Sequence, residues 1–279
     1  MWFVGGSIYP FLSDATKTIA PINIVFFRTF GTTILLGSIM LIFQPSALRS
    51  FKIDRRLIPV IVCAVLFYPI CSVALAWSST KVPGAVTALL FSTLPALMTV
   101  YAALRGRRPT RTAVTGVALA TVAVIFLVGA PNGSVTTSGV IAGLVSVLAW
   151  FVATEIWIRF IPNYPLLLAT TLQAFIGTVG CLLVRPLVGA PAIHFSQALR
   201  PSVLFLVFAL AAQHWSYLGI STRVSAPVLS SFAFVNPLVA GIVGYVVFSQ
   251  MITAIQGTAG LILLVGVFLV VREDVSSSR

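Results

Sequence analysis

Long apolar runs fill most of the 279-residue chain, and short segments that carry charge, proline or glycine separate them. A helix needs about 20 mostly apolar residues to cross a bilayer. Ten such runs are predicted: 2–18, 22–43, 57–78, 84–104, 111–129, 138–159, 165–188, 201–222, 226–249 and 253–271. The pattern therefore predicts an all-α integral membrane protein with ten transmembrane helices.

Two stretches of the chain match each other when one is shifted by 142 positions, which places Lys81 on Arg223 and Pro95 on Pro237. Each proline lies inside an apolar run, where it removes a backbone hydrogen bond and bends the helix. Bent helices at matching positions of two halves are typical of the substrate site of secondary transporters. The two prolines therefore indicate a repeated unit with a site near its bends.

The uncharged polar segment 130–137 divides the ten predicted helices into five and five. We predict a first five-helix repeat at 1–129, a linker loop at 130–137, a second five-helix repeat at 138–272 and a cytoplasmic tail at 273–279. Because five is odd, the second repeat enters the membrane from the opposite side. The two repeats are thus expected to be inverted relative to each other.

Loop charges give the expected orientation. With the N-terminus inside, twelve Lys and Arg residues fall in inner segments and four in outer loops. This asymmetry satisfies the positive-inside rule and predicts that both termini are cytoplasmic. The net charge of +12 is spread over these short loops, so we expect no nucleic-acid partner.

Composition excludes several classes of protein. Apolar residues make up 59% of the chain and charged residues 8%, against about 25% charged in soluble domains. Cys63, Cys71 and Cys181 lie inside apolar runs, where they are expected as small core residues rather than as disulfides or metal ligands. The sequence contains no phosphate-binding loop, HExxH or Gly-x-Ser-x-Gly motif, so neither an enzyme nor a cofactor is predicted.

The start of the chain shows no secretory signal. The triplet Trp2-Phe3-Val4 recurs at residues 150–152, where the apolar lead-in 138–149 precedes it. The first copy lacks this lead-in, so we expect that about ten residues needed to span the bilayer are missing before it.

The chain resembles the bacterial EamA-domain group of the drug/metabolite transporter superfamily. The residues that carry the resemblance are Lys17, Pro21, Arg28, Pro95, Pro237, Gln256, Gly257, Gly266 and Val267. It implies a small carrier of the bacterial inner membrane, with a cavity between the halves lined by helices three, four, eight and nine together with one and six. Many members have a glutamate where Gln250 stands here, so no role of that carboxylate is transferred.

Glu155 is the only acidic residue well inside an apolar run. An ionised carboxylate there costs several kcal/mol unless it is paired or hydrated. One interpretation makes it a site for a proton or a cationic substrate, with desolvation favouring its protonated form. The other makes it a structural partner of Arg159, one helical turn away.

Helix eight carries a candidate polar patch. Gln213 and His214 lie four and three residues before Tyr217, so these side chains can gather on one side and fix a substrate by hydrogen bonds. A lone histidine in an apolar run is also commonly a satisfied core residue. Asn236, just before a bending proline, offers a donor and an acceptor to a zwitterion.

Charged and aromatic candidates complete the predicted substrate site. Lys81 either holds an anionic substrate at one mouth of the cavity or anchors at the interface. Arg28 either pairs with Asp14 or lies at the outer interface. Aromatic rings could line the cavity and stack on amphipathic substrates, or form the interfacial belt. The aromatic site candidates are Tyr9, Tyr68, Trp77, Phe91, Trp150, Tyr217 and Phe234.

Together these features predict a secondary active transporter that exports amino acids or related small metabolites by alternating access, with proton coupling as one option. The alternatives are import or export of a different substrate class, such as drugs, and a membrane subunit that does not transport. Thr112, Gly116 and Ala120 form a stripe of small residues that suits either packing within the chain or a weak homodimer. The lipid bilayer and a small-molecule substrate are the expected partners.

Overall fold

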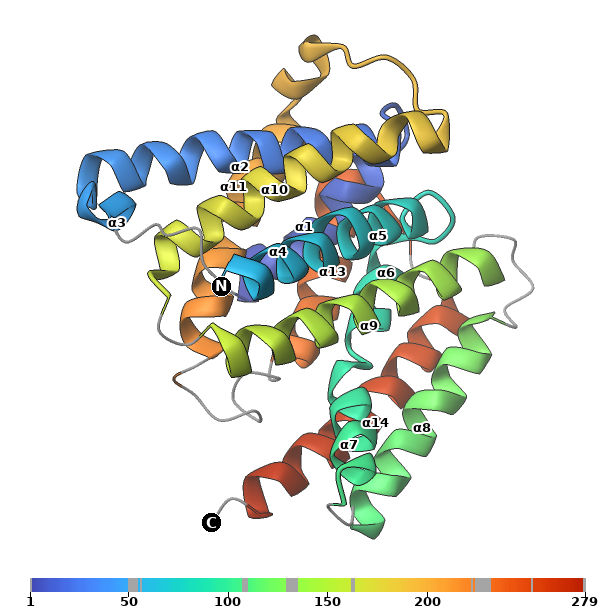
Figure 1. The fold of residues 1–279 in the computed structure, drawn as a ribbon. Coiled ribbons are helices and arrows are strands. Elements are labelled where there is room, and N and C mark those ends of the chain that lie inside the picture. The colour runs from blue at the N-terminus through green and yellow to red at the C-terminus, as the bar shows by residue number, and fades with distance from the viewer. Residues whose placement is uncertain are drawn as a thin grey trace.

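The computed structural model describes residues 2–49, 55, 57–106, 110–128, 135–161, 164–221, 223, 232–251 and 253–277. Within these ranges the chain is helical and contains no strand (Figure 1). Within the described residues, each predicted apolar run coincides with one helix or with two or three consecutive helical segments. The longer elements are α1 (Trp2–Ala15), α2 (Pro21–Phe43), α8 (Arg111–Val128), α9 (Thr137–Phe160), α10 (Leu166–Val184), α11 (Pro201–Ser221), α13 (Phe232–Phe248) and α14 (Ala254–Ser277).

Six segments of the described chain are long and apolar enough to cross a membrane. They are Pro21–Phe43, Leu57–Ser78, Gly84–Tyr101, Thr137–Phe160, Leu166–Val188 and Pro201–Ser221. Shorter apolar helices cover Arg111–Ala123, Val235–Phe248 and Ala254–Leu269. The molecule is thus a helical membrane protein. The last helix, α14, continues to Ser277, beyond the predicted end of the final apolar run.

The third predicted helix changes its hydrogen bonding midway. It consists of α4 (Leu57–Val65), the π-helix η1 (Leu66–Ser72) and α5 (Val73–Ser78). Pro69 lies inside η1 and has no backbone N–H to donate. The backbone N–H of Val73 donates to the carbonyl of Tyr68, five residues earlier. A wider turn therefore accommodates the proline without ending the helix.

The fourth predicted helix is not continuous. It is divided into α6 (Gly84–Phe91) and α7 (Leu94–Leu104) by a turn at residues 92–93. The hydroxyl of Ser92 donates to the carbonyl of Ala88 at 3.3 Å, and that of Thr93 donates to the carbonyl of Leu90 at 2.7 Å. Each of these carbonyls also accepts a backbone N–H, from Ser92 at 3.2 Å and from Thr93 at 3.1 Å, so the hydroxyls add second hydrogen bonds to the turn. The prediction of one bent helix over 84–104 was wrong in this respect.

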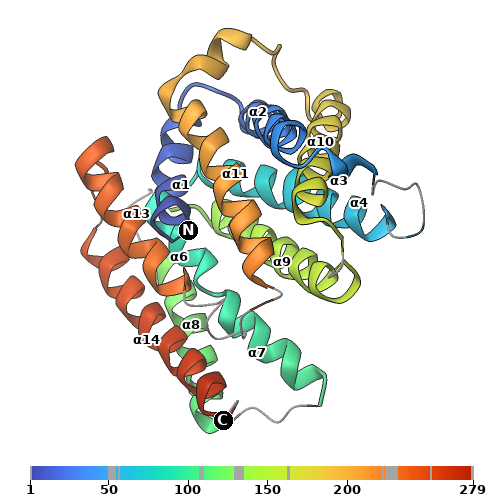
Figure 2. The same cartoon turned by 90° about the vertical axis from the view of Figure 1, so that its left-hand side faces the viewer.

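Helices from corresponding positions of the predicted halves pack together (Figures 1 and 2). Helix α2 contacts α10, and α8 contacts α14. Helix α1 contacts α11 and α13, while its counterpart α9 contacts the α4–η1–α5 segment and the α6–α7 segment. Each of these contacts joins a helix of residues 2–128 to a helix of residues 137–277.

Small residues allow α8 and α14 to approach closely. A Cβ atom on Gly266 would lie 2.7 Å from the carbonyl oxygen of Gly116 and 2.9 Å from the backbone nitrogen of Ala120. Such contacts would be too short, so only glycine fits there. The stripe of small residues in α8 is therefore used for packing within the chain.

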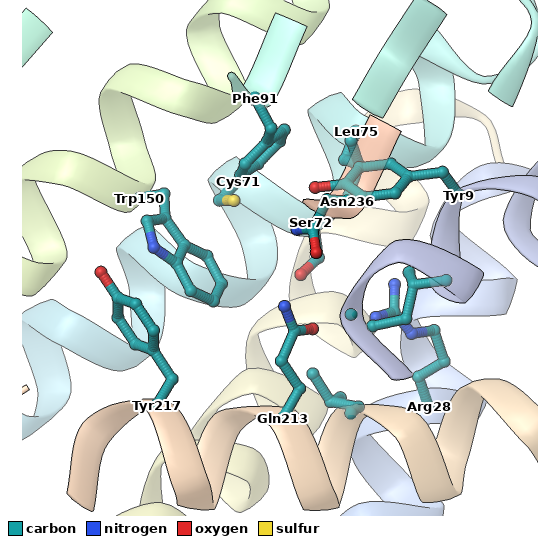
Figure 3. A pocket seen from close by; sticks show the side chains of 13 residues that line it. Tyr9, Arg28, Cys71, Ser72, Leu75, Phe91, Trp150, Gln213, Tyr217 and Asn236 are labelled. Carbon is teal, nitrogen blue, oxygen red and sulfur yellow. The ribbon is translucent and has the colours of Figure 1, made fainter. Parts of the chain in front are cut away.

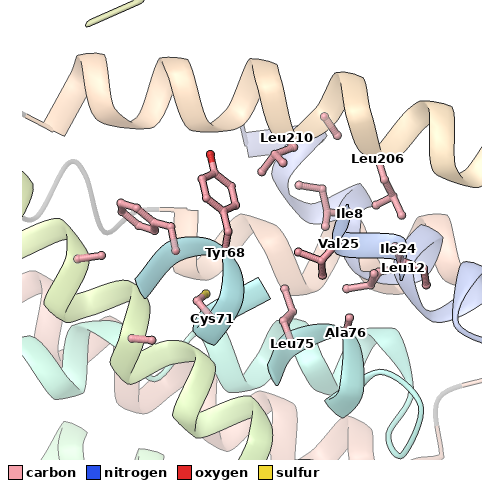
Figure 4. Close-up of a cluster of buried hydrophobic side chains, with 14 of the residues drawn as sticks. Ile8, Leu12, Ile24, Val25, Tyr68, Cys71, Leu75, Ala76, Leu206 and Leu210 are labelled. Atoms are coloured by element: carbon pink, nitrogen blue, oxygen red, sulfur yellow. The ribbon is translucent and has the colours of Figure 1, made fainter. Parts of the chain in front are cut away.

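The core and the surface are both apolar, as expected for a protein surrounded by lipid. Figure 4 shows the buried cluster in which Leu12, Ile24 and Leu206 contribute from α1, α2 and α11. On the outside, Phe43 is 75% exposed and Leu104 is 83% exposed. Side chains of this kind cover the outward faces of the helices, where hydrocarbon takes the place of water.

Candidate functional site

A cavity lies where helices of both halves meet (Figure 3). Its walls come from α1, α2, η1, α5, α6, α9, α11 and α13. The lining residues are Gly5, Ile8, Tyr9, Arg28, Cys71, Ser72, Leu75, Phe91, Trp150, Leu210, Gln213, Tyr217 and Asn236. The helices named by the family resemblance are all represented, and α2 joins them through Arg28.

The cavity is narrow in this conformation. The centre of a water molecule can reach only about 40 Å³ of its interior. By this measure one water needs roughly 10–15 Å³, so the cavity holds a few waters. A larger ligand requires the side chains around it to move.

Four aromatic rings form a continuous wall. The ring centroid of Phe91 lies 5.8 Å from that of Tyr9 and 6.2 Å from that of Trp150. The ring of Trp150 lies 5.1 Å from that of Tyr217. In Figure 3, Trp150 and Tyr217 close one side of the cavity, and Tyr9 and Arg28 close the other. The rings can stack on an apolar or aromatic part of a ligand.

Arg28 supplies the only charged group among the cavity-lining residues of the described chain. It is 3% exposed, and its Nε and Nη1 atoms have no hydrogen-bond partner. A guanidinium stays protonated even when buried, so an unpaired positive charge lies against the cavity. Keeping such a charge within a membrane protein costs several kcal/mol unless an anion or water compensates.

Arg28 does not occupy either of the positions predicted for it. Asp14 instead contacts Lys17, with 3.5 Å between Oδ1 and Nζ, and accepts a hydrogen bond from Ser202 at 2.6 Å. The predicted Arg28–Asp14 pair is therefore wrong, and so is the interfacial alternative. Arg28 lies seven residues after Pro21, about 10 Å along the helix axis, which is deep enough to reach the cavity.

Two amides converge on the cavity from the second half. Asn236 is 2% exposed, and its Oδ1 atom has no hydrogen-bond partner. A Cβ atom on Gly5 would lie 3.1 Å from Nε2 of Gln213 and 3.3 Å from Oδ1 of Asn236. The missing side chain at Gly5 thus leaves room for both amides beside the cavity.

Six of the predicted site residues line the cavity: Tyr9, Phe91, Trp150, Gln213, Tyr217 and Asn236. Two others lie behind its wall. Nε2 of His214 is 2.8 Å from Oε1 of Gln173, and the His214 ring is 5.4 Å from the ring of Tyr68. Both side chains are almost fully buried, and Nδ1 of His214 has no hydrogen-bond partner, so the interpretation as a satisfied core histidine is met only in part.

Trp77, Lys81 and Glu155 lie away from the cavity. Trp77 is 40% exposed, and Nζ of Lys81 lies 6.0 Å from the centre of its ring. Glu155 is paired with Arg159 at 2.8 Å, as in the structural interpretation of this residue. Phe234 belongs to α13, but its side chain lies outside the described residues.

Sequence reasoning did not predict seven of the lining residues: Gly5, Ile8, Arg28, Cys71, Ser72, Leu75 and Leu210. The depth of Arg28 within its apolar run was an available signal. Pro69 indicated an irregular turn shortly before Cys71 and Ser72. It did not indicate which side chains of that turn face the cavity. In the described part of the chain no group of three His, Cys, Asp or Glu side chains could hold a metal.

Comparison with known proteins gives a family for the first half. Residues 2–129 match the EamA-like transporter family, which confirms the resemblance to EamA-domain transporters for that part of the chain. A solved structure described as "Crystal structure of protein" shares the fold, with a TM-score of 0.67, 16% sequence identity, and coverage of 96% of this chain and 94% of that chain. No curated protein matches the chain.

Proposed function

Because residues 2–129 form an EamA-like transporter domain, we propose that this protein is a secondary active transporter that moves a small metabolite by alternating access. The observation that carries the proposal is the cavity, which is buried, partly polar and built by helices of both halves. A site at the junction of two repeats can open to either side when the halves rock against each other. The family is one of transporters, so catalysis is not part of the proposal.

The chemistry of the cavity favours an amino acid or a related small metabolite. Arg28 can bind a carboxylate, the carbonyl oxygen of Asn236 can accept from an ammonium group, and the aromatic rings can contact an apolar body. Export from the cytoplasm is the direction that the family resemblance favours.

Purified protein in proteoliposomes tests the proposal. We expect saturable, protein-dependent flux of at least one labelled amino acid or related metabolite. Trp150→Ala removes a ring of the cavity wall and is expected to reduce flux about tenfold. Trp215→Ala is the matched control, because Trp215 lies on α11 but is 48% exposed and outside the cavity. Equal effects of the two substitutions, or no flux of any metabolite, would contradict the proposal.

We also propose that the chain crosses the bacterial inner membrane ten times as two inverted five-helix repeats with both termini in the cytoplasm. The charge asymmetry of the loops and the contacts between counterpart helices support this topology. The three native cysteines are buried and are therefore shielded from an impermeant thiol reagent. Single cysteines at Thr80 and Thr222 are expected to react with an impermeant reagent from opposite sides. Reaction from the same side would exclude the inversion.

A further inference from the structure

The unpaired guanidinium of Arg28 points to a ligand that has to supply the missing negative charge. The ionisable side chains around it are Tyr9, Tyr68, Cys71 and Cys181, and none of them is a carboxylate. Nε and Nη1 retain unused donors in a nearly fully buried side chain. Within the described structure, nothing neutralises the charge of Arg28.

The acidic side chains that the structure describes are committed elsewhere. Asp14 is bound to Lys17 and Ser202, at the end of α1 and the start of α11. Glu155 is bound to Arg159 on the outer side of α9. Because neither carboxylate lines the cavity, the site offers no anionic group to a cationic substrate.

We propose that Arg28 binds the carboxylate of the transported substrate, and that the site selects organic carboxylates with a small apolar or aromatic body over organic cations. The inference rests on the proposed transport function and names the substrate class of the same cavity. A carboxylate suits the guanidinium because it accepts charge-assisted hydrogen bonds from the free donors.

The rest of the cavity fits the other parts of such a molecule. Tyr9, Phe91 and Trp150 form a wall of rings that can pack on an apolar body. The free Oδ1 of Asn236 can accept from an ammonium group, if the substrate carries one. The carboxylate is therefore the required group, and the ammonium is an additional one.

Three probes share a phenyl ring and differ in their charged groups. L-Phenylalanine has a carboxylate and an ammonium, 3-phenylpropionate has only the carboxylate, and phenethylamine has only the ammonium. Binding is measured as thermal stabilisation of the detergent-purified full chain, and transport as flux in proteoliposomes. We expect both carboxylates to stabilise the protein and to be transported. Phenethylamine is expected to bind at least tenfold more weakly. Equal binding of phenethylamine, or no binding of either carboxylate, would overturn the inference.

Variants connect the effect to the guanidinium. Arg28→Gln is expected to weaken binding of 3-phenylpropionate at least tenfold, while Arg28→Lys retains part of it. Arg159→Gln removes a guanidinium outside the cavity and is the matched control, expected to leave binding unchanged. The ligand-free thermal midpoint of Arg28→Gln is expected to equal or exceed that of the wild type, because an unpaired buried charge is lost. Unchanged binding by a folded Arg28→Gln protein would refute the assignment.

The two proposals can fail separately. Flux of a cationic or neutral metabolite that is insensitive to Arg28→Gln would leave the transporter function intact and would overturn the carboxylate site. Carboxylate binding without flux of any labelled compound would support the site and contradict the transporter.

Discussion

Arg28 and Glu155 are both charged residues within apolar helices, yet their surroundings are opposite. Glu155 is bound to Arg159, which also donates to the Tyr101 hydroxyl at 2.8 Å. Both partners of this ion pair are partly exposed: the Arg159 side chain is 39% exposed and the Glu155 side chain is 28% exposed. Arg28 is nearly fully buried and unpaired beside a cavity.

The comparison shows that a charge inside a membrane helix is not by itself a site. Both residues carry a charge within an apolar helix, and such charges are commonly functional. Glu155 is neutralised by Arg159 on the same helix, whereas Arg28 has no charged partner and lies against the cavity. What distinguishes them is the presence or absence of a protein partner, and this depends on packing between distant helices.

Reversing the charge at each position gives the largest expected difference. Arg28→Glu places a carboxylate where a carboxylate substrate binds, so flux of 3-phenylpropionate is expected to fall about a hundredfold or more. Disrupting one partner of a buried charge pair costs about 3–5 kcal/mol, which corresponds to that factor. Arg159→Glu is expected to change the flux no more than about twofold. Initial rates in proteoliposomes measure both, and similar losses would remove the distinction between the two positions.

A smaller and more selective effect is expected at Asn236. Asn236→Leu keeps the size of the side chain but removes the free acceptor. A hydrogen bond to a charged group contributes about 1.5–3 kcal/mol, so binding of L-phenylalanine is expected to weaken about ten- to a hundredfold. Binding of 3-phenylpropionate, which has no ammonium, should stay the same. A titration of thermal stability with each probe tests this, and a uniform loss for both would show that Asn236 has only a structural role.

The smallest effect is expected at Glu155. Glu155→Gln breaks the pair with Arg159, which is partly exposed and thus contributes no more than about 1 kcal/mol. We expect the flux to remain within twofold of the wild type at every imposed pH gradient, and the thermal midpoint to fall only slightly. A flux that loses its dependence on the pH gradient in this variant would instead establish Glu155 as the proton site.

The sequence was sufficient to predict the helices because the apolar runs are long and sharply bounded. Most of their ends agree with the structure within a few residues, for example 57–78 for the α4–η1–α5 segment, whereas α14 continues past the predicted end at 271 to Ser277. Local breaks were harder to predict, since a proline in an apolar run does not indicate whether the helix widens, as at Pro69, or divides, as before Pro95.

The candidate site was only partly predictable for a related reason. Residue type identified Trp150 and Asn236 as polar or aromatic side chains in bent or central helices, and they line the cavity. The same reasoning selected His214, which is hidden behind the wall, and expected Arg28 either to pair with Asp14 or to lie at the outer interface. Which face of a helix turns inward is set by contacts between helices, and a nearly uniform apolar sequence carries little information about them.

The π-helix at Leu66–Ser72 decides which side chains the third predicted helix presents to the cavity. Cys71 and Ser72 face the cavity from this wide turn, which holds one more residue than an α-helical turn. Without that residue, the side chains beyond it would be rotated by about 100° around the axis. Pro69 holds the wide turn in place, so one proline sets which groups of this helix a substrate meets.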